Sequence, residues 1–452
     1  MERSFDVVVL GAGPAGETVA GRLGEAGLEV AIVEAHLVGG ECSYYACMPS
    51  KALLRPAQVV AETRRVPGIA TGPLDVEAVL RRRDEVVYDL EDSAQLPWLE
   101  QRGVTLVRGL GRLDGERRVA LGGDVLLARR AVVLATGTRP LLPELPGLAE
   151  AAVWTNREGT NASSVPERLL VLGGGVAGVE LAQAWASLGA SVTVLEGAER
   201  LLAREEPFAG EQVADGLREL GATVRTGVRA MASRREGGGE VVVELDDGSG
   251  ATGDELLVAV GRRPATTGIG LESVGLVSGE AVDVGDDLRS RAHAWLWAVG
   301  DVNGRAPLTH MGKYQARLAA DAILGRDVRV RSDGALSPRV IFTEPQVAAV
   351  GHTLASAQAA GLRARAVDVD SGGSAGGSFV GRGAAGTSRL VVDEDRRVLV
   401  GATFTGPEVA EWLHAATIAV VAEVPLDTLW HAVPAFPTRS EVWLKLLEAY
   451  GL

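Results

Sequence analysis

The chain has 452 residues with 45 basic and 59 acidic side chains, a net charge of −14 and two cysteines. This length exceeds what one hydrophobic core organises, so we expect two to four domains. The acidic balance, without a Lys/Arg-rich tract, disfavours nucleic acid and anionic membranes as partners. So few cysteines exclude a disulfide scaffold and fit a reducing compartment. A strand begins by Phe5, too early for a signal peptide, and no apolar run reaches membrane-spanning length, so we expect a cytoplasmic protein.

The first predicted unit is a strand, a glycine-rich turn, a helix and a second strand. A buried parallel strand at residues 5–10 leads into Gly11-Ala-Gly13-Pro-Ala-Gly16, and the second strand ends in Glu34. This order is the dinucleotide-binding fingerprint, although an ordinary tight turn is the alternative. Gly11 permits the turn, Gly13 lets backbone N–H groups reach a pyrophosphate, and Gly16 lets the helix lie close to the strand. Glu34 can accept hydrogen bonds from a ribose.

Both cysteines of the chain lie close together in the segment that follows. Four residues separate Cys42 from Cys47, a glycine pair precedes Cys42, and Pro49 with the apolar residues after it suggests a helix starting around the cysteine pair. Cys47 would then lie near the positive end of a helix, where thiolates are stabilised. The pair is either a reversible dithiol or two buried structural cysteines.

The glycine-rich unit recurs about 160 residues later. A strand precedes Gly173-Gly-Gly175-Val-Ala-Gly178, and the next strand ends in Glu196. Two units imply two dinucleotides, and an acid at the second strand end favours NAD over NADP. Arg200 lies close enough in sequence to blur this preference, and a solvated strand end remains the alternative for Glu196.

Three further strand ends are candidates for ligand contacts. One apolar strand ends in Ala135-Thr136-Gly137, a second covers residues 256–260 before Gly261, and a third ends in Gly300-Asp301. All three could be ordinary strand ends, and Asp301 could be a turn-forming residue.

The character of the sequence changes from about residue 337. Strands at 340–342, 390–392 and 399–404 look antiparallel, and a Gly/Ser-rich stretch at 371–386 reads as a flexible connection. Apolar helices are predicted at 409–421 and 438–447. This part lacks a nucleotide fingerprint, so we expect an interaction or dimerisation module.

Taken together, these motifs resemble the FAD-dependent pyridine nucleotide-disulfide oxidoreductases, the family of dihydrolipoyl dehydrogenase, glutathione reductase and mercuric reductase. The resemblance runs from Phe5 to about Leu447 and includes Cys42-x4-Cys47-Met-Pro-Ser-Lys51 and Phe342-Thr-Glu-Pro. It implies an α/β fold with two Rossmann-like dinucleotide-binding domains and a C-terminal α+β dimerisation domain. The expected domains are FAD-binding (1–148 and 270–335), NAD(H)-binding (149–269) and dimerisation (336–452).

The resemblance also implies roles for single residues. The first glycine motif and Glu34 would hold the ADP part of FAD, Gly111 would meet adenine through its backbone, and Asp301 would bind the ribityl chain. Lys51 would lie by the flavin ring with Glu180 as its partner. NAD(H) would occupy the second unit, with NADP(H) less favoured.

For the two cysteines, the resemblance implies that Cys47 is the thiol nearest the flavin and that Cys42 is the thiol that meets substrate. A hydride would pass from NADH to the flavin and on to the disulfide, whose thiols then reduce an acceptor. The protein would act as a homodimer. We expect no metal site.

One departure concerns proton transfer. The family motif His-Pro-Thr-x-x-Glu reads Phe436-Pro-Thr-Arg-Ser-Glu441 here, so the acid/base His is absent while Glu441 remains a candidate catalytic residue. His431 is a candidate substitute or an ordinary interface residue. Tyr44 and Tyr45 could line an acceptor pocket or be packing residues.

Three functions stay open for the acceptor side. The first is reduction of a small-molecule or protein disulfide. The second is reduction of a quinone or metal ion, for which the absent His matters less. The third is a flavoprotein binding subunit of a 2-oxoacid dehydrogenase complex.

Overall fold

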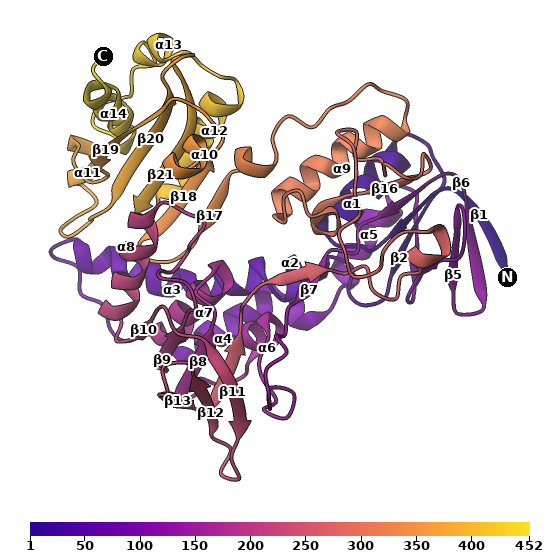
Figure 1. The fold of residues 1–452 in the computed structure, drawn as a ribbon, viewed down its shortest axis with the longest axis horizontal. Helices are drawn as coiled ribbons and strands as arrows, with labels where there is room; N and C mark the ends of the chain where they lie inside the picture. The colour runs from indigo at the N-terminus through magenta and orange to yellow at the C-terminus, as the bar shows by residue number, and fades with distance from the viewer. The chain divides into compact units, whose positions relative to one another are not determined.

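The computed structural model describes residues 1–452, which form two compact units. Unit 1 comprises residues 1–49, 84–141 and 262–334, and unit 2 comprises residues 50–83, 142–261 and 335–452. Each unit is described separately below (Figure 1).

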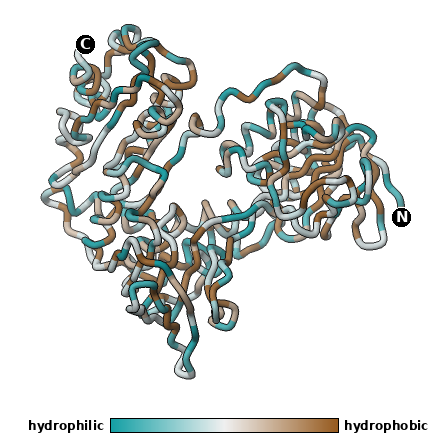
Figure 2. The backbone as a smooth tube through the Cα atoms, in the orientation of Figure 1, coloured by the Kyte–Doolittle hydropathy of each residue, from teal (hydrophilic) through white to brown (hydrophobic).

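Unit 1 is built on a seven-stranded sheet in the order β3-β2-β1-β6-β5-β4, with β16 paired to β6. The parallel strands are β1 (Glu2–Leu10), β2 (Val30–Glu34), β3 (Val104–Arg108), β6 (Asp124–Leu134) and β16 (Leu296–Ala298). Two antiparallel strands extend the sheet beyond β6: β5 (Arg118–Leu121) pairs with β6, and β4 (Arg112–Leu113) pairs with β5. The central strands are runs of buried Val, Leu and Ile, brown in Figure 2, as expected for strands covered on both faces.

Helices and a small ribbon complete unit 1. They are α1 (Pro14–Glu25), α2 (Gly40–Tyr44), α5 (Leu96–Glu100), α9 (Thr309–Ile323), and the paired strands β7 (Thr138–Pro140) and β15 (Arg262–Pro264). Pro14 occupies the first turn of α1, where its missing N–H costs nothing. Helices α1 and α9 lie against each other, with Ala15 in contact range of Gly300 and Gly312.

Unit 2 contains a four-stranded parallel sheet in the order β10-β9-β8-β14. Its strands are β8 (Arg168–Leu172), β9 (Ser191–Leu195), β10 (Thr223–Arg225) and β14 (Glu255–Val258). Around it lie α6 (Asn156–Asn161), α7 (Val176–Ser187), α8 (Pro207–Glu219) and the antiparallel ribbon of β11 (Ala230–Arg235), β12 (Val241–Leu245) and β13 (Gly250–Gly253). Thr155 and Glu158 form a capping box that starts α6.

Two long helices cross the boundary between the units along the chain, α3 (Cys47–Arg65) and α4 (Val76–Val86). Leu53 and Leu54 of α3 and Leu80 of α4 are buried in the core beneath the parallel sheet of unit 2. Apolar contact therefore fixes these helices within unit 2 from Ser50 to Arg83.

The rest of unit 2 is a five-stranded antiparallel sheet in the order β17-β18-β21-β20-β19. The strands are β17 (Arg339–Ile341), β18 (Gln346–Gly351), β19 (Ala364–Asp370), β20 (Thr387–Asp393) and β21 (Val398–Gly406). The helices are α10 (Leu354–Ala359), α11 (Ala375–Ser378), α12 (Leu413–Val421), α13 (Leu426–Trp430) and α14 (Val442–Tyr450). Phe404, fully buried, lies near Trp412 and Trp443 in the core of this sheet.

The predicted fold class, two Rossmann-like sheets and a C-terminal antiparallel α+β part, is confirmed. Some local predictions were confirmed and others were wrong. The helix expected to start around the cysteine pair is α3, which begins at Cys47, so that prediction is confirmed; a separate short helix that was not predicted, α2, carries Cys42 and ends before Tyr45 (φ −136°). The strand predicted at 256–260 ends at Val258, before the predicted end.

In the C-terminal part, the helix predicted at 409–421 has a 3₁₀ first turn. The stretch 371–386 contains α11, whose backbone N–H groups donate hydrogen bonds to the side chains of Ser374 and Glu441. No helix of the chain has both the length and the apolar character that a membrane span requires.

Candidate functional site

The carboxyl ends of the parallel strands in unit 1 carry four of the predicted contact segments. Gly11 follows β1, Glu34 ends β2, Ala135 follows β6, and Asp301 comes shortly after β16. Because these strands are parallel neighbours, their carboxyl ends meet at one edge of the sheet, where open α/β sheets bind ligands.

The glycines of the first motif differ in the atoms that a side chain would meet. A Cβ on Gly11 (φ +99°) would lie 2.5 Å from the Ala135 carbonyl oxygen, and one on Gly16 would lie 1.9 Å from the Gly11 oxygen. A Cβ on Gly13 would meet no protein atom within 4 Å. The protein itself therefore requires the outer glycines, whereas only a ligand would need the middle one.

Glu34 and Gly111 lie beside this turn. The two carboxylate oxygens of Glu34 accept hydrogen bonds from the backbone N–H of Ala12 and His36, each at 2.7 Å. A carboxylate has further lone pairs, so ribose hydroxyls remain possible donors. A Cβ on Gly111 would lie within 3 Å of Leu10 and Val33, which explains a glycine there.

The strand-end segments of unit 1 hold polar groups that fit a bound dinucleotide. The Thr136 hydroxyl is buried and has no hydrogen-bond partner in the protein. Asp301 is mostly buried, which raises the pKa of its carboxyl, and the Thr138 hydroxyl donates to it at 2.8 Å and works against that shift. Arg262 donates to the same hydroxyl at 2.7 Å, so Arg262, Thr138 and Asp301 form one chain. These residues fit FAD, because a bound cofactor would supply the hydrogen-bond partner that the buried Thr136 hydroxyl lacks in the protein.

The two thiols lie together in unit 1. Cys42 is in α2 and Cys47 opens α3, and their thiols are hydrogen-bonded to each other. This hydrogen bond, together with burial, raises the pKa of the Cys42 thiol, while the Thr309 hydroxyl and the charge of Lys313 act in the opposite direction. The Thr309 hydroxyl lies 3.4 Å from Cys47 Sγ. Two thiols in contact are in position to close reversibly.

Lys51 and Glu180 form an ion pair in unit 2, as predicted. Lys51 Nζ lies 2.6 Å from Glu180 Oε2, and the Glu180 side chain is 4% exposed. The other Glu180 oxygen accepts a hydrogen bond from the backbone N–H of Phe342 at 2.9 Å.

The second glycine motif has the same geometry as the first. A Cβ on Gly173 would lie 2.6 Å from the Ala259 oxygen, one on Gly178 would lie 1.9 Å from the Gly173 oxygen, and one on Gly175 would meet nothing within 4 Å. Glu196 accepts from the backbone N–H of Gly174 and Ala198. Gly261 has φ +145° just after β14.

Arg200, the cation that could favour NADP over NAD, makes hydrogen bonds to backbone carbonyl groups. Its guanidinium donates to the carbonyl oxygens of Ala203 and Glu205, at 2.9 and 3.2 Å. Its own loop therefore holds this cation.

The C-terminal candidates lie in unit 2. Glu441 accepts a hydrogen bond from the backbone N–H of Gly376 at 2.9 Å, so it anchors α11. Phe436 is 77% exposed, and His431 is exposed at the end of α13. Tyr44 is 1% exposed, so it is a packing residue and cannot line a pocket.

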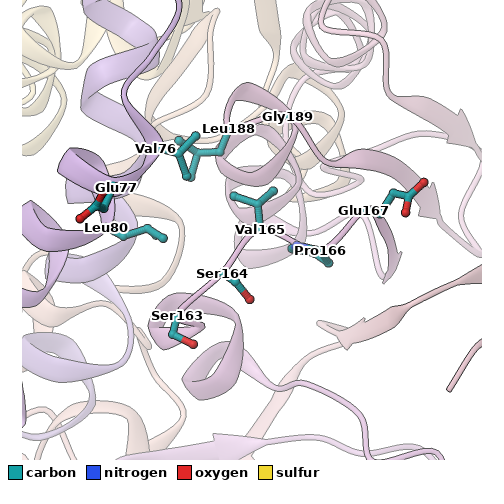
Figure 3. Close-up of a pocket in the computed structure, with 10 residues that line it drawn as sticks. All are labelled: Val76, Glu77, Leu80, Ser163, Ser164, Val165, Pro166, Glu167, Leu188 and Gly189. Atoms are coloured by element: carbon teal, nitrogen blue, oxygen red, sulfur yellow. The ribbon is translucent and has the colours of Figure 1, made fainter.

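An open cavity of about 570 Å³ in unit 2 lies apart from these residues (Figure 3). Val76, Leu80 and Leu188 form its apolar wall, and none of the predicted site residues lines it. The cavity therefore adds nothing to the predicted site.

Sequence reasoning missed Thr138, Thr309 and the polar contacts of Arg262. Thr309 could have been found as the first residue of a helix just after the Gly-Asp strand end. Thr138 and Arg262 follow the two recognised strand ends, but only the pairing of β7 with β15 brings them together.

Comparisons with known proteins agree with this geometry. Residues 5–316 match the family described as pyridine nucleotide-disulphide oxidoreductase, and residues 337–447 match its dimerisation domain. Dihydrolipoyl dehydrogenase 3 of Pseudomonas aeruginosa is 34% identical over 98% of this chain and 97% of its own length. Mercuric reductase of Staphylococcus aureus is 28% identical over 97% of this chain and 81% of its own.

A solved structure of similar fold is the HOCl-induced flavoprotein disulfide reductase RclA of Escherichia coli. Its TM-score is 0.86 at 25% identity, covering 98% of this chain and 99% of that one. The chain therefore belongs to the pyridine nucleotide-disulphide oxidoreductase family and is an FAD-dependent, NAD(P)H-dependent disulfide oxidoreductase.

Proposed function

We propose that this oxidoreductase uses NADH to reduce a disulfide through Cys42 and Cys47. The observation that carries the proposal is the contact between the two thiols, in the unit that also holds the first glycine motif and Asp301. The chain has no other cysteine, so any dithiol chemistry within one chain must use this pair.

The cofactor contacts follow from the two sheet edges. We assign FAD to the carboxyl edge of the unit 1 sheet, with contacts from Gly11, Gly13, Gly16, Glu34, Gly111, Ala135, Thr136, Gly137 and Asp301. We assign NAD(H) to the edge of the parallel sheet in unit 2, with contacts from Gly173, Gly175, Gly178, Glu196 and Gly261. When bound, FAD accepts a hydride and delivers an electron pair.

The cysteines then carry that pair to the acceptor. The Cys42–Cys47 disulfide takes up two electrons and two protons and becomes two thiols. Cys42, as thiolate, attacks a substrate disulfide and releases one substrate thiol, and Cys47 attacks the mixed disulfide, releases the second thiol and restores the Cys42–Cys47 bond. Thr309, beside Cys47, is placed to hold a proton or donate to the sulfur.

NADH is the proposed donor in preference to NADPH. Glu196 would accept from a free ribose 2′-hydroxyl and repel a 2′-phosphate. The engagement of Arg200 with its own loop supports this, since that cation already donates to two carbonyl oxygens of the chain.

A quinone or metal ion is the second candidate acceptor. Phe436 has no ionisable group and so cannot help a thiol exchange its proton, and one Glu441 oxygen accepts a hydrogen bond from the Gly376 N–H within the chain. General acid–base help is typically worth about 10²–10⁴-fold. A quinone that takes electrons directly from the flavin does not need it. The similarity to mercuric reductase supports a metal ion as another candidate acceptor.

The assembly proposals rest on the C-terminal part. The match to a dimerisation domain supports a homodimer. We propose the three-domain division given above, with boundaries at 148, 269 and 335. The similarity to dihydrolipoyl dehydrogenases supports a binding role in a 2-oxoacid dehydrogenase complex. No feature of the candidate site supports that role. The two-cysteine composition supports a cytoplasmic location.

One experiment separates the acceptor classes. The purified yellow protein is reduced anaerobically with NADH or NADPH, and disulfides, quinones and metal ions are then offered to wild type and to Cys42→Ser. We expect Cys42→Ser to lose disulfide turnover and to keep its reduction by NADH. Undiminished disulfide turnover in this variant would refute the dithiol route, and a higher kcat/KM with NADPH would refute the role given to Glu196.

A further inference from the structure

Lysine is rare in this chain, and one of its lysines makes an unusual set of contacts. Among 45 basic residues only Lys51, Lys313 and Lys445 are lysines. Lys51 lies in the second turn of α3, and the family resemblance implies that its ammonium lies by the flavin ring, so the inference below rests on the proposed function.

Phe342 contacts both members of the Lys51–Glu180 ion pair. Its ring lies under the ammonium, with Nζ 4.8 Å from the ring centroid. Its backbone N–H donates to the Glu180 oxygen that Lys51 does not use, at 2.9 Å. One residue therefore restrains the cation through its ring and the anion through its backbone.

Both restraints help to fix the ammonium, which also donates to the Ser50 hydroxyl at 3.3 Å. The Lys51 side chain is 34% exposed and ends in a point charge on a flexible four-carbon stem. A carboxylate alone would let the ammonium move around its two oxygens. With one oxygen occupied by an N–H and one side of the ammonium covered by a ring, a single arrangement is favoured.

The segment that carries Phe342 is itself held in place. Gln58 of α3 donates to the Phe342 carbonyl oxygen at 3.0 Å, and Gln183 of α7 accepts from the Glu344 N–H at 2.6 Å. Arg65, at the end of α3, forms an ion pair with the Glu344 carboxylate. The segment joins β17 to β18, so the first hairpin of the C-terminal sheet is tied along α3 from Gln58 to Arg65.

We propose that Phe342 is a positioning residue for Lys51, and that its ring and its N–H together fix the place of the Lys51 ammonium. The C-terminal sheet, through its first hairpin, thus determines the position of this charge within unit 2. This role differs from the role of the C-terminal domain in dimerisation.

The rarity of lysine makes the test specific. The purified flavoprotein is labelled with a trace of acetic anhydride, and the rate at Lys51 is compared by mass spectrometry with the rates at Lys313 and Lys445. Phe342→Leu removes the ring and keeps the backbone N–H. We expect labelling of Lys51 to become about two- to fivefold faster, the range of one exposed cation–π contact, while the other two lysines keep their rates.

Two variants serve as controls. Phe342→Tyr keeps a ring and should restore the wild-type rate at Lys51. Phe208→Leu removes a different ring, 5.1 Å from the Arg389 guanidinium, and should leave Lys51 unaffected. If Phe342→Leu fails to fold, Phe342→Met carries the same expectation. An unchanged rate at Lys51, or an equal rise at all three lysines, would overturn the proposal.

The link to the flavin has its own readout. We expect the visible flavin spectrum to shift in Phe342→Leu and to return in Phe342→Tyr, because a displaced charge changes the field at the ring. Faster labelling with an unchanged spectrum would overturn this link. Labelling needs no turnover, so a wild-type protein that reduces no disulfide would refute the proposed function and leave the labelling result intact.

Discussion

Gly13→Ala tests whether the open space beside Gly13, which no protein atom fills, is occupied by a ligand. Gly13 has φ −73° and ψ 178°, which alanine adopts without strain, and its Cβ would meet no protein atom within 4 Å. The substitution should therefore leave the fold intact, with a stability loss below about 1 kcal/mol from the weaker helix cap.

The expected effect falls on FAD. A methyl group at Gly13 would keep the pyrophosphate from the backbone N–H groups at the start of α1, at a cost of one charged hydrogen bond. Such a bond is worth about 1.5–3 kcal/mol, so the Kd for FAD should rise by about 10- to 150-fold. Gly16→Ala should behave differently, because its Cβ would lie 1.9 Å from the Gly11 oxygen and must disturb the turn itself.

The assay is reconstitution of the flavin-free protein with FAD, followed by absorbance and by thermal unfolding without ligand. Gly175→Ala is the matched control, since Gly175 has φ −78° and the same open space in the second motif. That variant should bind FAD normally and need more NADH for reduction. Wild-type FAD affinity in Gly13→Ala would refute the assignment of FAD to this edge.

Three further predictions concern protons and charge. Phe436→His supplies a proton carrier and should raise disulfide turnover by up to about 10²–10⁴-fold without changing quinone reduction; equal effects on both acceptors would contradict it. Thr309→Val removes the hydroxyl beside Cys47, so the pKa of Cys42 should rise further and the pH profile of thiol alkylation should move to higher pH; an unmoved profile would dismiss this contact. Burial raises the pKa of Glu17 from 4.5 to about 7, so its contribution to stability is full below pH 4.5 and falls as pH rises toward 7. Glu17→Gln should therefore raise the melting temperature at pH 8 but not at pH 4, by at most about 3 kcal/mol in stability, and equal melting curves at pH 8 would rule this out.

The two glycine motifs were predictable because the requirement on the last glycine of each is local. Gly16 meets the oxygen of Gly11, and Gly178 meets that of Gly173, five residues away in each case. The strands before them are buried on both faces and read as apolar runs. Spacing within about 25 residues was enough to identify the unit and its acidic strand end.

The boundaries around the cysteines were less accessible. The sequence predicted a helix that starts around the pair, which is α3, but not the separate short helix α2 that carries Cys42 and ends before Cys47. Backbone geometry at a single residue, Tyr45, decides this. Helix periodicity contains no information about such a break.

Sequence alone was sufficient for the two nucleotide-binding units and the cysteine pair, because each depends on residue type and short spacing. The tertiary structure decided which distant groups support them. Thr309 reaches Cys47 across 262 positions, and Phe342 meets Lys51 and Glu180 from another sheet. Such contacts arise only when separate elements are packed against one another, and no periodicity along the chain records which elements become neighbours.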